Sequence, residues 1–286
     1  MAEKTNKGRL SEAEFERIRR LVYDSIGVNL TDSKKPLIIS RLSKRLRKLN
    51  LSTFDEYIDF LEKDSAELET MFNLITTNVT KFFREDHHFE YLKHSFLPKL
   101  EAEAQRSARK KSLRAWSAGC STGEEPYSLA IVLKDYFAEQ EDWQISILAS
   151  DINTEVLREA QEGVYIQKKV EDIPYELLTK YFKLGTGPNQ GLFKVKKSLR
   201  SLISFKQINL TSPEPYPIGE ELDIIFCRNV FIYFNLQTQK RVLKRFYEHL
   251  APGGLLMLGH SEKIDLMDEE AGDWRLVEAT IYQRLP

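Results

Sequence analysis

The sequence predicts a doubly wound α/β domain with a small antiparallel β insertion, preceded by a small all-α domain. Two observations support this prediction. Up to about residue 77 the apolar residues recur at helical spacing and no strand pattern appears. From about residue 112 short apolar runs alternate with helical segments, which is typical of a parallel sheet covered by helices. A chain of 286 residues is long enough to fold as two such units.

The composition restricts the function classes before any motif is considered. Lys and Arg number 42 against 43 Asp and Glu, so recognition by charge must come from local patches. Cys120 and Cys227 are the only cysteines, which excludes a disulfide framework and favours a reducing compartment. Because there is no run of about 18 apolar residues and no apolar segment near the N-terminus, we expect a cytoplasmic protein that does not insert into a membrane.

The N-terminal helices have clear boundary signals. Ser11 and Glu14 form a capping box, the apolar residues that follow share one face, and Gly27 is a helix stop. A second helix is expected after Asp32, and two short helices follow it. Residues 1–77 are therefore predicted to form one small helical unit.

The remainder of the chain carries the strand signals. Buried parallel strands are predicted at 145–149 and 222–227, each followed by a helical segment. The segment 251–262 is predicted to be a turn and a strand, and 279–285 a final edge strand or hairpin partner. Residues 163–208 interrupt the alternation with a helix-like stretch, a glycine loop and two alternating runs. We interpret this region as a small β subdomain inserted in the sheet domain.

A glycine-bearing turn connects the strand-like run 114–118 to a helix. Gly119 and Gly123 bound this turn, an arrangement by which α/β proteins hold nucleotide-like ligands. Its spacing is neither that of a dinucleotide loop nor that of a P-loop. Glu124 and Glu125 follow at the start of the helix, where they would repel a phosphate. The turn therefore favours a ligand that presents positive charge, or at least no phosphate, to it.

Asp151 ends the next predicted strand. In a nucleotide-binding fold an acid at this place accepts hydrogen bonds from ribose hydroxyls. The alternative is a helix N-cap for the residues that follow. Because the glycine turn lies at the carboxyl end of a neighbouring strand, the two features together favour the ligand role.

Six ordered motifs carry a family resemblance that spans essentially the whole chain. They are NVTKFFR at 78–84, SAGCSTGEEPYS at 117–128, SDINTEVL at 150–157, NL at 209–210, FCRNVFIYF at 226–234 and GHSE at 259–262. Together they resemble the chemotaxis receptor methyltransferases, which transfer a methyl group from S-adenosylmethionine to glutamate side chains of chemoreceptors. The resemblance implies a Rossmann-like methyltransferase domain at 112–286, a connecting segment with cofactor contacts at 78–111, and a receptor-recognition domain at 1–77.

The resemblance implies S-adenosylmethionine as the cofactor and S-adenosylhomocysteine as its product. The cofactor contacts carry over to Asn78, Thr80, Arg84, Ala118, Gly119, Glu124, Asp151, Asn209, Leu210, Arg228 and Asn229. This cofactor has no phosphate and carries an ammonium and a sulfonium, so it tolerates glutamates beside the turn. We expect its carboxylate to bind Arg84.

A glutamate acceptor needs little activation by catalytic residues. Its carboxylate has a pKa of about 4.3, so it is ionised at neutral pH and attack on the sulfonium methyl needs no general base. The enzyme must align and partly desolvate this carboxylate. Tyr233 is the residue that we expect to orient it. Pairing with Arg228 would blunt the nucleophile, so we assign Arg228 to the cofactor and to the architecture of the loop.

Two other kinds of chemistry are disfavoured. His87 and His88 are adjacent on a helix and have no third ligand nearby, so no metal site is expected. Cys120 and Cys227 have no evident base beside them and are interpreted as packing residues.

The second helix carries a basic stripe, formed by Arg41, Lys44, Arg45 and Lys48 at helical spacing. Such a stripe is usually a solvated face. Here no acid interrupts it in the sequence, which favours recognition of an acidic partner. The resemblance implies that this partner is the cytoplasmic helices of chemoreceptors.

The glycine loop of the insertion is a second candidate contact with the receptor. Gly185, Gly187 and Gly191 match the spacing of a loop with which some family members bind a C-terminal tail peptide of the receptor. The alternation after the loop, with Phe193 and Val195 on one side, is typical of an edge strand that could pair with such a peptide. The alternative is a plain hairpin turn.

Two other functions are alternatives to receptor methylation. Methylation of nucleic acid is disfavoured because the chain lacks a D/N-P-P-Y/F motif and a basic platform interleaved with aromatic residues. A noncatalytic signalling module that binds S-adenosylmethionine stays open, because cofactor binding and methyl transfer use overlapping residues.

Overall fold

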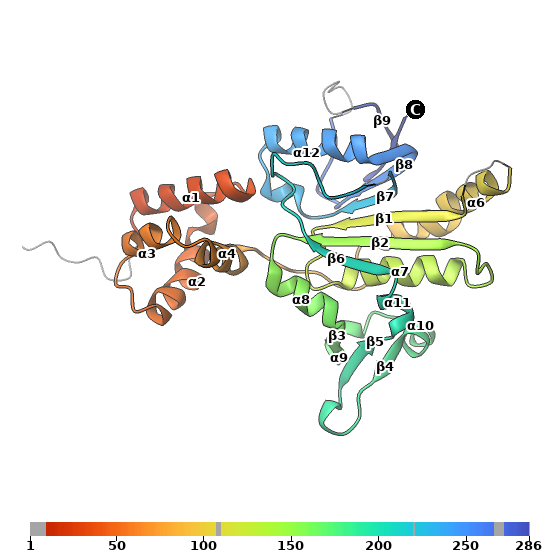
Figure 1. Ribbon diagram of the computed structural model, residues 1–286, viewed down its shortest axis with the longest axis horizontal. Coiled ribbons are helices and arrows are strands. Elements are labelled where there is room, and N and C mark those ends of the chain that lie inside the picture. The colour runs from red at the N-terminus through yellow and green to blue at the C-terminus, as the bar shows by residue number, and fades with distance from the viewer. Residues whose placement is uncertain (1–9, 107–109, 220, 266–271, 286) are drawn as a thin grey trace, which may run out of the picture.

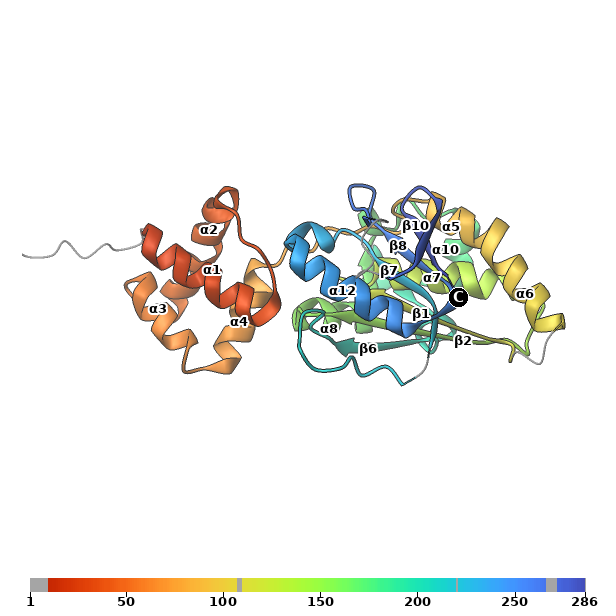
Figure 2. The ribbon, with the colours of Figure 1, turned by 90° about the horizontal axis from the view of Figure 1, so that it is seen from above.

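The computed structural model describes residues 10–106, 110–219, 221–265 and 272–285. Two units lie end to end along the longest axis, with the helical domain at one end and the α/β domain at the other (Figures 1 and 2). The first nine residues of the predicted helical unit lie outside the described residues. None of the helices in the described ranges is both long and apolar enough to cross a bilayer.

The helical domain confirms the four predicted helices. They are α1 (Glu12–Ile26), α2 (Lys35–Lys48, preceded by the short η1, Asp32–Lys34), α3 (Phe54–Leu61) and α4 (Ser65–Ile75). The Ser11–Glu14 capping box is present, and Gly27 ends α1 in the left-handed conformation with φ 67°. The apolar faces of all four helices meet in one core of their own.

Half of the basic stripe on α2 is engaged within the domain. Arg45 forms a two-pronged ion pair with the buried Glu67 of α4, at 2.8 and 2.5 Å, and Glu67 also accepts a hydrogen bond from Tyr57. Arg41 donates to the carbonyl oxygens of Leu74 and Thr76, each at 2.7 Å, and so caps the end of α4. The sequence did not predict these contacts, because Glu67 and the carbonyl groups belong to α4 and its C-terminal end and not to α2. Only Lys44 and Lys48 remain as exposed cations of the stripe.

The α/β domain is built on a seven-stranded sheet in the order β6-β2-β1-β7-β8-β10-β9. The strands are β1 (Ser112–Ala118), β2 (Gln144–Asp151), β6 (Ile203–Gln207), β7 (Leu222–Cys227), β8 (Leu250–Leu258), β9 (Trp274–Glu278) and β10 (Ile281–Arg284). The first five are parallel, and β10 runs antiparallel between β8 and β9. The predicted parallel strands are confirmed, and the C-terminal strand is a hairpin partner rather than an edge.

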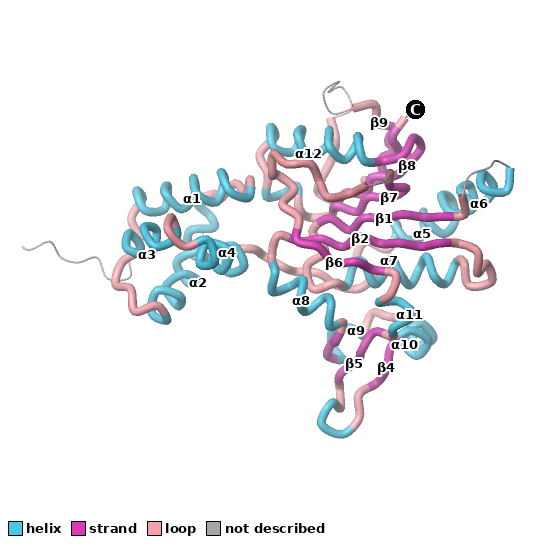
Figure 3. Tube along the Cα trace, in the orientation of Figure 1, coloured by secondary structure: helices cyan, strands magenta, loops and turns pink. Residues whose placement is uncertain are grey.

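Helices cover both faces of this sheet, as in a doubly wound fold (Figures 1 and 3). They are α7 (Glu124–Tyr136), α8 (Thr154–Glu162), α12 (Leu236–His249) and the continuous run α5 (His87–Tyr91), π-helical η2 (Leu92–Phe96) and α6 (Leu97–Arg106). The run α5–α6 takes up residues 87–106 of the segment 78–111, which was predicted to be a connection. Its apolar residues Phe89, Leu92 and Leu97 share one core with the strands, so it is part of the α/β domain.

The insertion forms a separate three-stranded antiparallel sheet that projects from the main body (Figure 3). Its strands are β3 (Val164–Ile166), β4 (Phe182–Leu184) and β5 (Leu192–Val195), and its helices are α9 (Gln167–Val170), α10 (Tyr175–Tyr181), the short η3 (Gly187–Asn189) and α11 (Lys197–Arg200). This architecture confirms the predicted fold class, an α/β domain with a small antiparallel insertion behind an all-α domain.

Two details of the insertion were predicted wrongly. The last alternating run in 163–208 is β6, which pairs in parallel with β2 and belongs to the main sheet. The strand with Phe193 and Val195 is central, because β3 and β4 pair with β5 on either side. The alternation of apolar and polar residues shows which side chains of a strand share a face. It does not show how many strands pair with that strand, or to which sheet it belongs.

Candidate functional site

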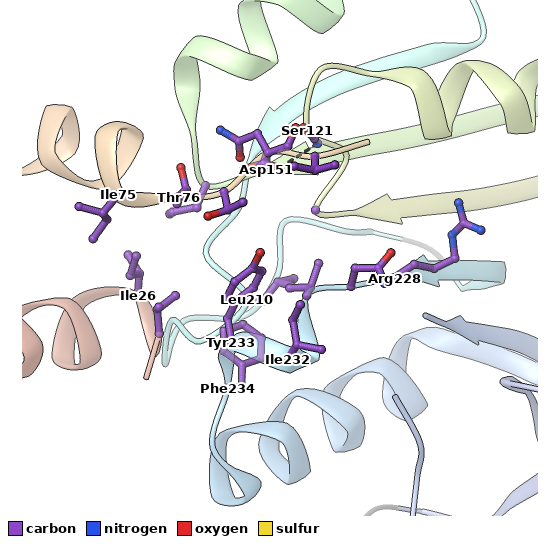
Figure 4. A pocket seen from close by; sticks show the side chains of 18 of the residues that line it. Ile26, Ile75, Thr76, Ser121, Asp151, Leu210, Arg228, Ile232, Tyr233 and Phe234 are labelled. Carbon is purple, nitrogen blue, oxygen red and sulfur yellow. Dashed lines mark hydrogen bonds between the residues drawn. The ribbon is translucent and has the colours of Figure 1, made fainter. Parts of the chain in front are cut away.

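A cavity of about 320 Å³ lies where the carboxyl ends of the parallel strands meet the helical domain (Figure 4). Its walls come from the turn after β1, the end of β2, the loops after β6 and β7, and the chain between α4 and α5. The carboxyl edge is where open α/β sheets bind ligands. The volume is in the range of pockets that enclose a nucleoside-sized molecule.

This cavity brings together most of the residues that the sequence assigned to the cofactor. Those that line it are Asn78, Thr80, Arg84, Gly119, Asp151, Asn209, Leu210, Arg228 and Asn229, together with Tyr233. They come from five separate segments of the chain. Among the predicted cofactor residues, Ala118 and Glu124 do not line the cavity.

The turn after β1 is shaped by glycine and by one carboxylate. Gly119 has φ 90°, and a Cβ there would lie 2.5 Å from Cγ2 of Val230, so only glycine lets the turn approach the loop after β7. The backbone N–H of Ser121 donates to Asp151 at 2.9 Å. The turn and the end of β2 are thereby fixed to each other.

Asp151 is not the N-cap of the following helix. Asn153 has that position, since its side chain accepts from the N–H groups of Glu155 and Val156. Asp151 accepts from the N–H groups of Ser121 and Asn153, one on each oxygen, which leaves lone pairs of both oxygens for a ligand. Burial raises the pKa of Asp151, and these hydrogen bonds counter part of that rise. A partly satisfied buried carboxylate at this edge suits ribose hydroxyls.

The two glutamates after the turn have different roles. Glu124 is fully buried on the side away from the cavity, where it accepts from Lys169 at 2.6 Å and from Thr122 at 2.7 Å. Glu125 lines the cavity and pairs with Arg228 at 2.8 Å. The structure thus places Glu125, and not the predicted Glu124, at the cavity. Adjacent helical positions point about 100° apart, and only the docking of the helix decides which of them faces the cavity.

Ala118 also lies outside the cavity. Its side chain is buried in the core that contains Trp116 and Leu256. A residue at the last position of a strand can point to either face of the sheet. The motif alone did not distinguish them.

Arg228 is held from every side and is almost entirely buried, with 2% of its side chain exposed. Its guanidinium pairs with Glu125, lies 3.8 Å from the Glu85 carboxylate and donates to the carbonyl oxygen of Arg84. It also lies over the rings of Phe89 and Phe226. These contacts fix the loop after β7 against α5 and α7, as an architectural role requires.

His88 completes this buried network as a neutral group. Because Arg228 can only donate, Nδ1 of His88 accepts at 3.1 Å, and the proton lies on Nε2, which faces the Thr280 hydroxyl at 2.9 Å. Burial, reinforced by the positive charge of Arg228, lowers the pKa of His88 to about 2. His88 is therefore uncharged at neutral pH.

Tyr233 lies across the cavity from Asp151 (Figure 4). Burial raises the pKa of its phenol, against a smaller opposing effect of a hydrogen bond with Thr77. The phenol is therefore protonated at neutral pH and can donate a hydrogen bond. Its backbone carbonyl accepts from the N–H of Asn29, which ties its position to the helical domain.

The helical domain supplies one wall that the sequence did not predict. Ile26, Leu30 and Ile75 line the cavity from this side. The domain is anchored by hydrogen bonds such as that from the Asn209 side chain to the carbonyl of Ser25 at 2.7 Å. No sequence signal marks these residues, because the same apolar positions also form the core of the helical domain.

Metal and thiol chemistry have no support at this site. In the described ranges no cluster of three or more His, Cys, Asp and Glu side chains is placed to hold a metal ion. Cys120 and Cys227 are buried thiols whose pKa burial raises well above the usual range.

Comparison with known proteins identifies the family. Residues 78–281 match the CheR methyltransferase, SAM binding domain, and residues 13–76 match the CheR methyltransferase, all-alpha domain. The chain belongs to the CheR methyltransferase family. It is 45% identical over 249 residues to chemotaxis protein methyltransferase 2 of Pseudomonas aeruginosa, which covers 87% of this chain and 86% of the relative. It is 41% identical to the chemotaxis protein methyltransferase of Escherichia coli over 92% of this chain and 89% of the relative.

Membership of the CheR family makes S-adenosylmethionine the cofactor of this chain. The cavity fits this molecule. Asp151 offers acceptors to ribose hydroxyls, Ile152 and Leu210 provide aliphatic walls for a base, and Arg84 lines the cavity with N–H donors for a carboxylate. The boundary between the two family domains falls at residues 76–78, in the segment that connects α4 to the cavity.

We expect Asp151→Ala to raise the dissociation constant for S-adenosylhomocysteine about 5- to 150-fold, because it removes hydrogen bonds worth about 1–3 kcal/mol. Arg84→Ala should weaken binding at least as much, since the cofactor carboxylate loses a charged partner. Titration calorimetry measures both. Glu162→Ala, an exposed acid on α8, is the control. Unchanged affinity in folded Asp151→Ala and Arg84→Ala proteins would remove these residues from the site.

Proposed function

We propose that this chain methylates glutamate side chains on the cytoplasmic helices of chemoreceptors, and that it does so in the cytoplasm. The products are a glutamate methyl ester and S-adenosylhomocysteine. The main support is the cavity at the carboxyl edge of the sheet, which holds the cofactor residues and Tyr233 around one space. Relatives at 41 to 45% identity are named chemotaxis protein methyltransferases, which supports the receptor as the substrate.

Bound S-adenosylmethionine would supply an electrophilic methyl group on a sulfonium. A glutamate oxygen would form the new C–O bond as the C–S bond breaks, and the electron pair of that bond would stay on sulfur. No proton moves in this step, so no general base is required. The chain's own task is to align the carboxylate and to exclude water from it.

Tyr233 is the residue that we assign to the acceptor. Its phenol is protonated and lies in the cavity, so it can donate one hydrogen bond to the carboxylate and orient it. A single neutral donor orients the nucleophile without neutralising it. Arg228 is already paired with Glu125, which supports its assignment to the framework of the site.

The noncatalytic alternative has no specific support. The matched family domain and the curated relatives are all named for methyl transfer. Methylation of nucleic acid has no specific support either, because half of the basic stripe on α2 is engaged inside the helical domain.

The test is a filter assay with cofactor labelled in the methyl group and a receptor fragment that contains candidate helices. We expect label on the receptor fragment that alkali releases as methanol, because esters hydrolyse in base and methylated nitrogen does not. The control is the same reaction with S-adenosylhomocysteine in excess. Label that resists alkali, or label on added RNA, would contradict the ester; saturable cofactor binding without transfer to any receptor would favour the noncatalytic module.

The exposed cations of α2 are proposed as a contact with the receptor. Arg41 and Arg45 remain part of the stripe, but their guanidinium groups hold α4 and Glu67. Reversing Arg45 would leave Glu67 buried without its partner, so loss of activity would follow from misfolding. Lys44 and Lys48 are therefore the residues with which the hypothesis can be tested.

We expect Lys44→Glu with Lys48→Glu to lower kcat/KM for the receptor about tenfold, while cofactor affinity is unchanged. Salt should slow the wild type, because it screens exposed charges over about 8–10 Å, and it should slow the variant less. Initial rates at several ionic strengths measure both effects. Lys99→Glu with Lys110→Glu, exposed and remote from α2, is the matched control. If the methylation rate of the wild type does not change with salt concentration, the basic stripe is only a solvent-exposed helix face and does not contact the receptor.

The glycine loop is proposed as a tether for a receptor tail peptide, through an open edge of the small sheet. The edges are β3 and β4, since β5 is central. On either side of β4, the carbonyl of Tyr181 accepts from the N–H of Lys196, and the N–H of Gly185 donates to the carbonyl of Leu192. By the alternation of an antiparallel ladder, the N–H of Leu184 therefore points outward. The same alternation points the N–H of Ile166 in β3 outward. Gly187 has φ 56°, so its replacement by valine would strain the loop whether or not a peptide binds.

Proline at an outward position removes one edge donor and leaves the ladder with β5 intact. A tail peptide pairs with one of the two edges, so we expect one of the variants Leu184→Pro and Ile166→Pro to weaken its binding about tenfold or more. The alanine variants at the same sites should bind the peptide as the wild type does. Fluorescence anisotropy of a labelled peptide measures this. A receptor fragment without its tail should be methylated at the wild-type rate. If the wild type binds no tail peptide from its own organism's receptors, the tether hypothesis is wrong and the glycine loop is only a hairpin turn.

A further inference from the structure

Three exposed apolar side chains surround the mouth of the cofactor cavity. Val79 is 78% exposed, Ile232 53% and Leu236 66%. Other large exposed apolar residues of the described chain lie on the small sheet and its helix, or on β9. The grouping at the cavity mouth is therefore local, and we call these three residues the apolar rim.

The rim is continuous with the cavity. Val79 and Ile232 line the cavity itself. Ile232 and Leu236 line a second hollow, which shares Ile232 and Ser261 with the first. The apolar surface thus begins at the cofactor cavity and continues over the start of α12.

The backbone of the rim is fixed, so these side chains are held outward. The N–H of Ile232 donates to the buried carboxylate of Glu262 at 3.2 Å. Leu236 is the first residue of α12, whose N-cap Asn235 accepts from the N–H of Thr238 at 2.9 Å. The carbonyl of Val79 accepts from Arg84 at 3.1 Å. An apolar surface held open in this way is preorganised for a partner.

We propose that the apolar rim binds the face of the substrate helix that carries the acceptor glutamate. This inference rests on the proposed function, which makes that helix the substrate. A glutamate side chain that enters the cavity brings its own backbone to the mouth. Residues three and four positions away lie on the same helix face, about 5–6 Å from it, and so meet the rim. The rim thus selects acceptors flanked at those positions by apolar or small residues.

The contact also contributes to the reaction. Covering the rim removes water from the mouth of the cavity, where the acceptor carboxylate must be partly desolvated. Binding free energy gained on neighbouring residues offsets that desolvation. The exposed Lys263 lies at the second hollow, where it can face another acidic residue of an acidic helix. The rim therefore discriminates among glutamates that have similar charge but different neighbours.

The test uses near-isosteric polar substitutions, Val79→Thr, Ile232→Thr and Leu236→Gln, alone and combined. Because these side chains are exposed, the variants retain the fold. We expect KM for a receptor fragment to rise about three- to tenfold for each variant and more for the combination. Leu236→Gln lies outside the cofactor cavity, so its dissociation constant for S-adenosylhomocysteine should equal that of the wild type. Leu276→Gln, 48% exposed on β9, is the matched control.

A second substrate makes the test specific. In a receptor fragment whose apolar residues three and four positions from the acceptor are replaced by serine, the wild type should show the raised KM, and the rim variants should add little to it. Unchanged KM in the combined variant, or an equal rise in Leu276→Gln, would overturn the inference while the proposed function stands. A wild type that binds cofactor and esterifies no receptor would overturn the proposed function, and the inference with it.

Discussion

Arg228 and Glu125 form a buried ion pair, 2.8 Å between Nε and Oε2, that joins the loop after β7 to the helix after the glycine turn. The two loops come from neighbouring strands, β7 and β1, and each lines the cavity. Removing either partner would leave a buried charge without its counterion. Because the guanidinium also binds the carbonyl of Arg84 and faces Glu85 and His88, the same contact positions the segment between the helical domain and α5.

A second buried carboxylate orders the loop after β7. Glu262 accepts from the N–H groups of Asn229, Gly259 and Ile232, at 2.8, 2.6 and 3.2 Å. Asn229 is in the left-handed region with φ 61°, and a Cβ at Gly259 would lie 2.8 Å from Glu262. The loop that carries Arg228 and Tyr233 is therefore wrapped around an internal anion. The GHSE motif supplies that anion and the glycine that gives it room.

The sequence predicted the parts of this molecule that depend on local pattern. The capping box of α1, the buried strands and the glycine turn were recognisable because each is a short-range constraint. Most of the residues that the motif resemblance assigned to the cofactor line one cavity. The resemblance did not predict that Glu125 lines the cavity and Glu124 does not, because the rotation of the helix decides this. Nor did it predict the wall formed by Ile26 and Ile75, which depends on how the helical domain docks. Strand neighbours were equally hidden, since alternation does not show that β5 is central.

The geometry of the site, and not a gain in folding stability, explains why Asp151 and Glu262 are buried carboxylates. Burial raises the pKa of both, and their backbone hydrogen bonds only partly oppose that rise. The folded state therefore keeps these protons to a higher pH than the unfolded chain does, so the stability they contribute is present at low pH and is lost as pH rises through the folded pKa. Above that pKa each ionised carboxylate lowers the free energy of unfolding. Asp151 keeps lone pairs on the cavity side for a ligand, and Glu262 holds the loop after β7 in place, so each geometry offsets a cost that the fold alone would not favour.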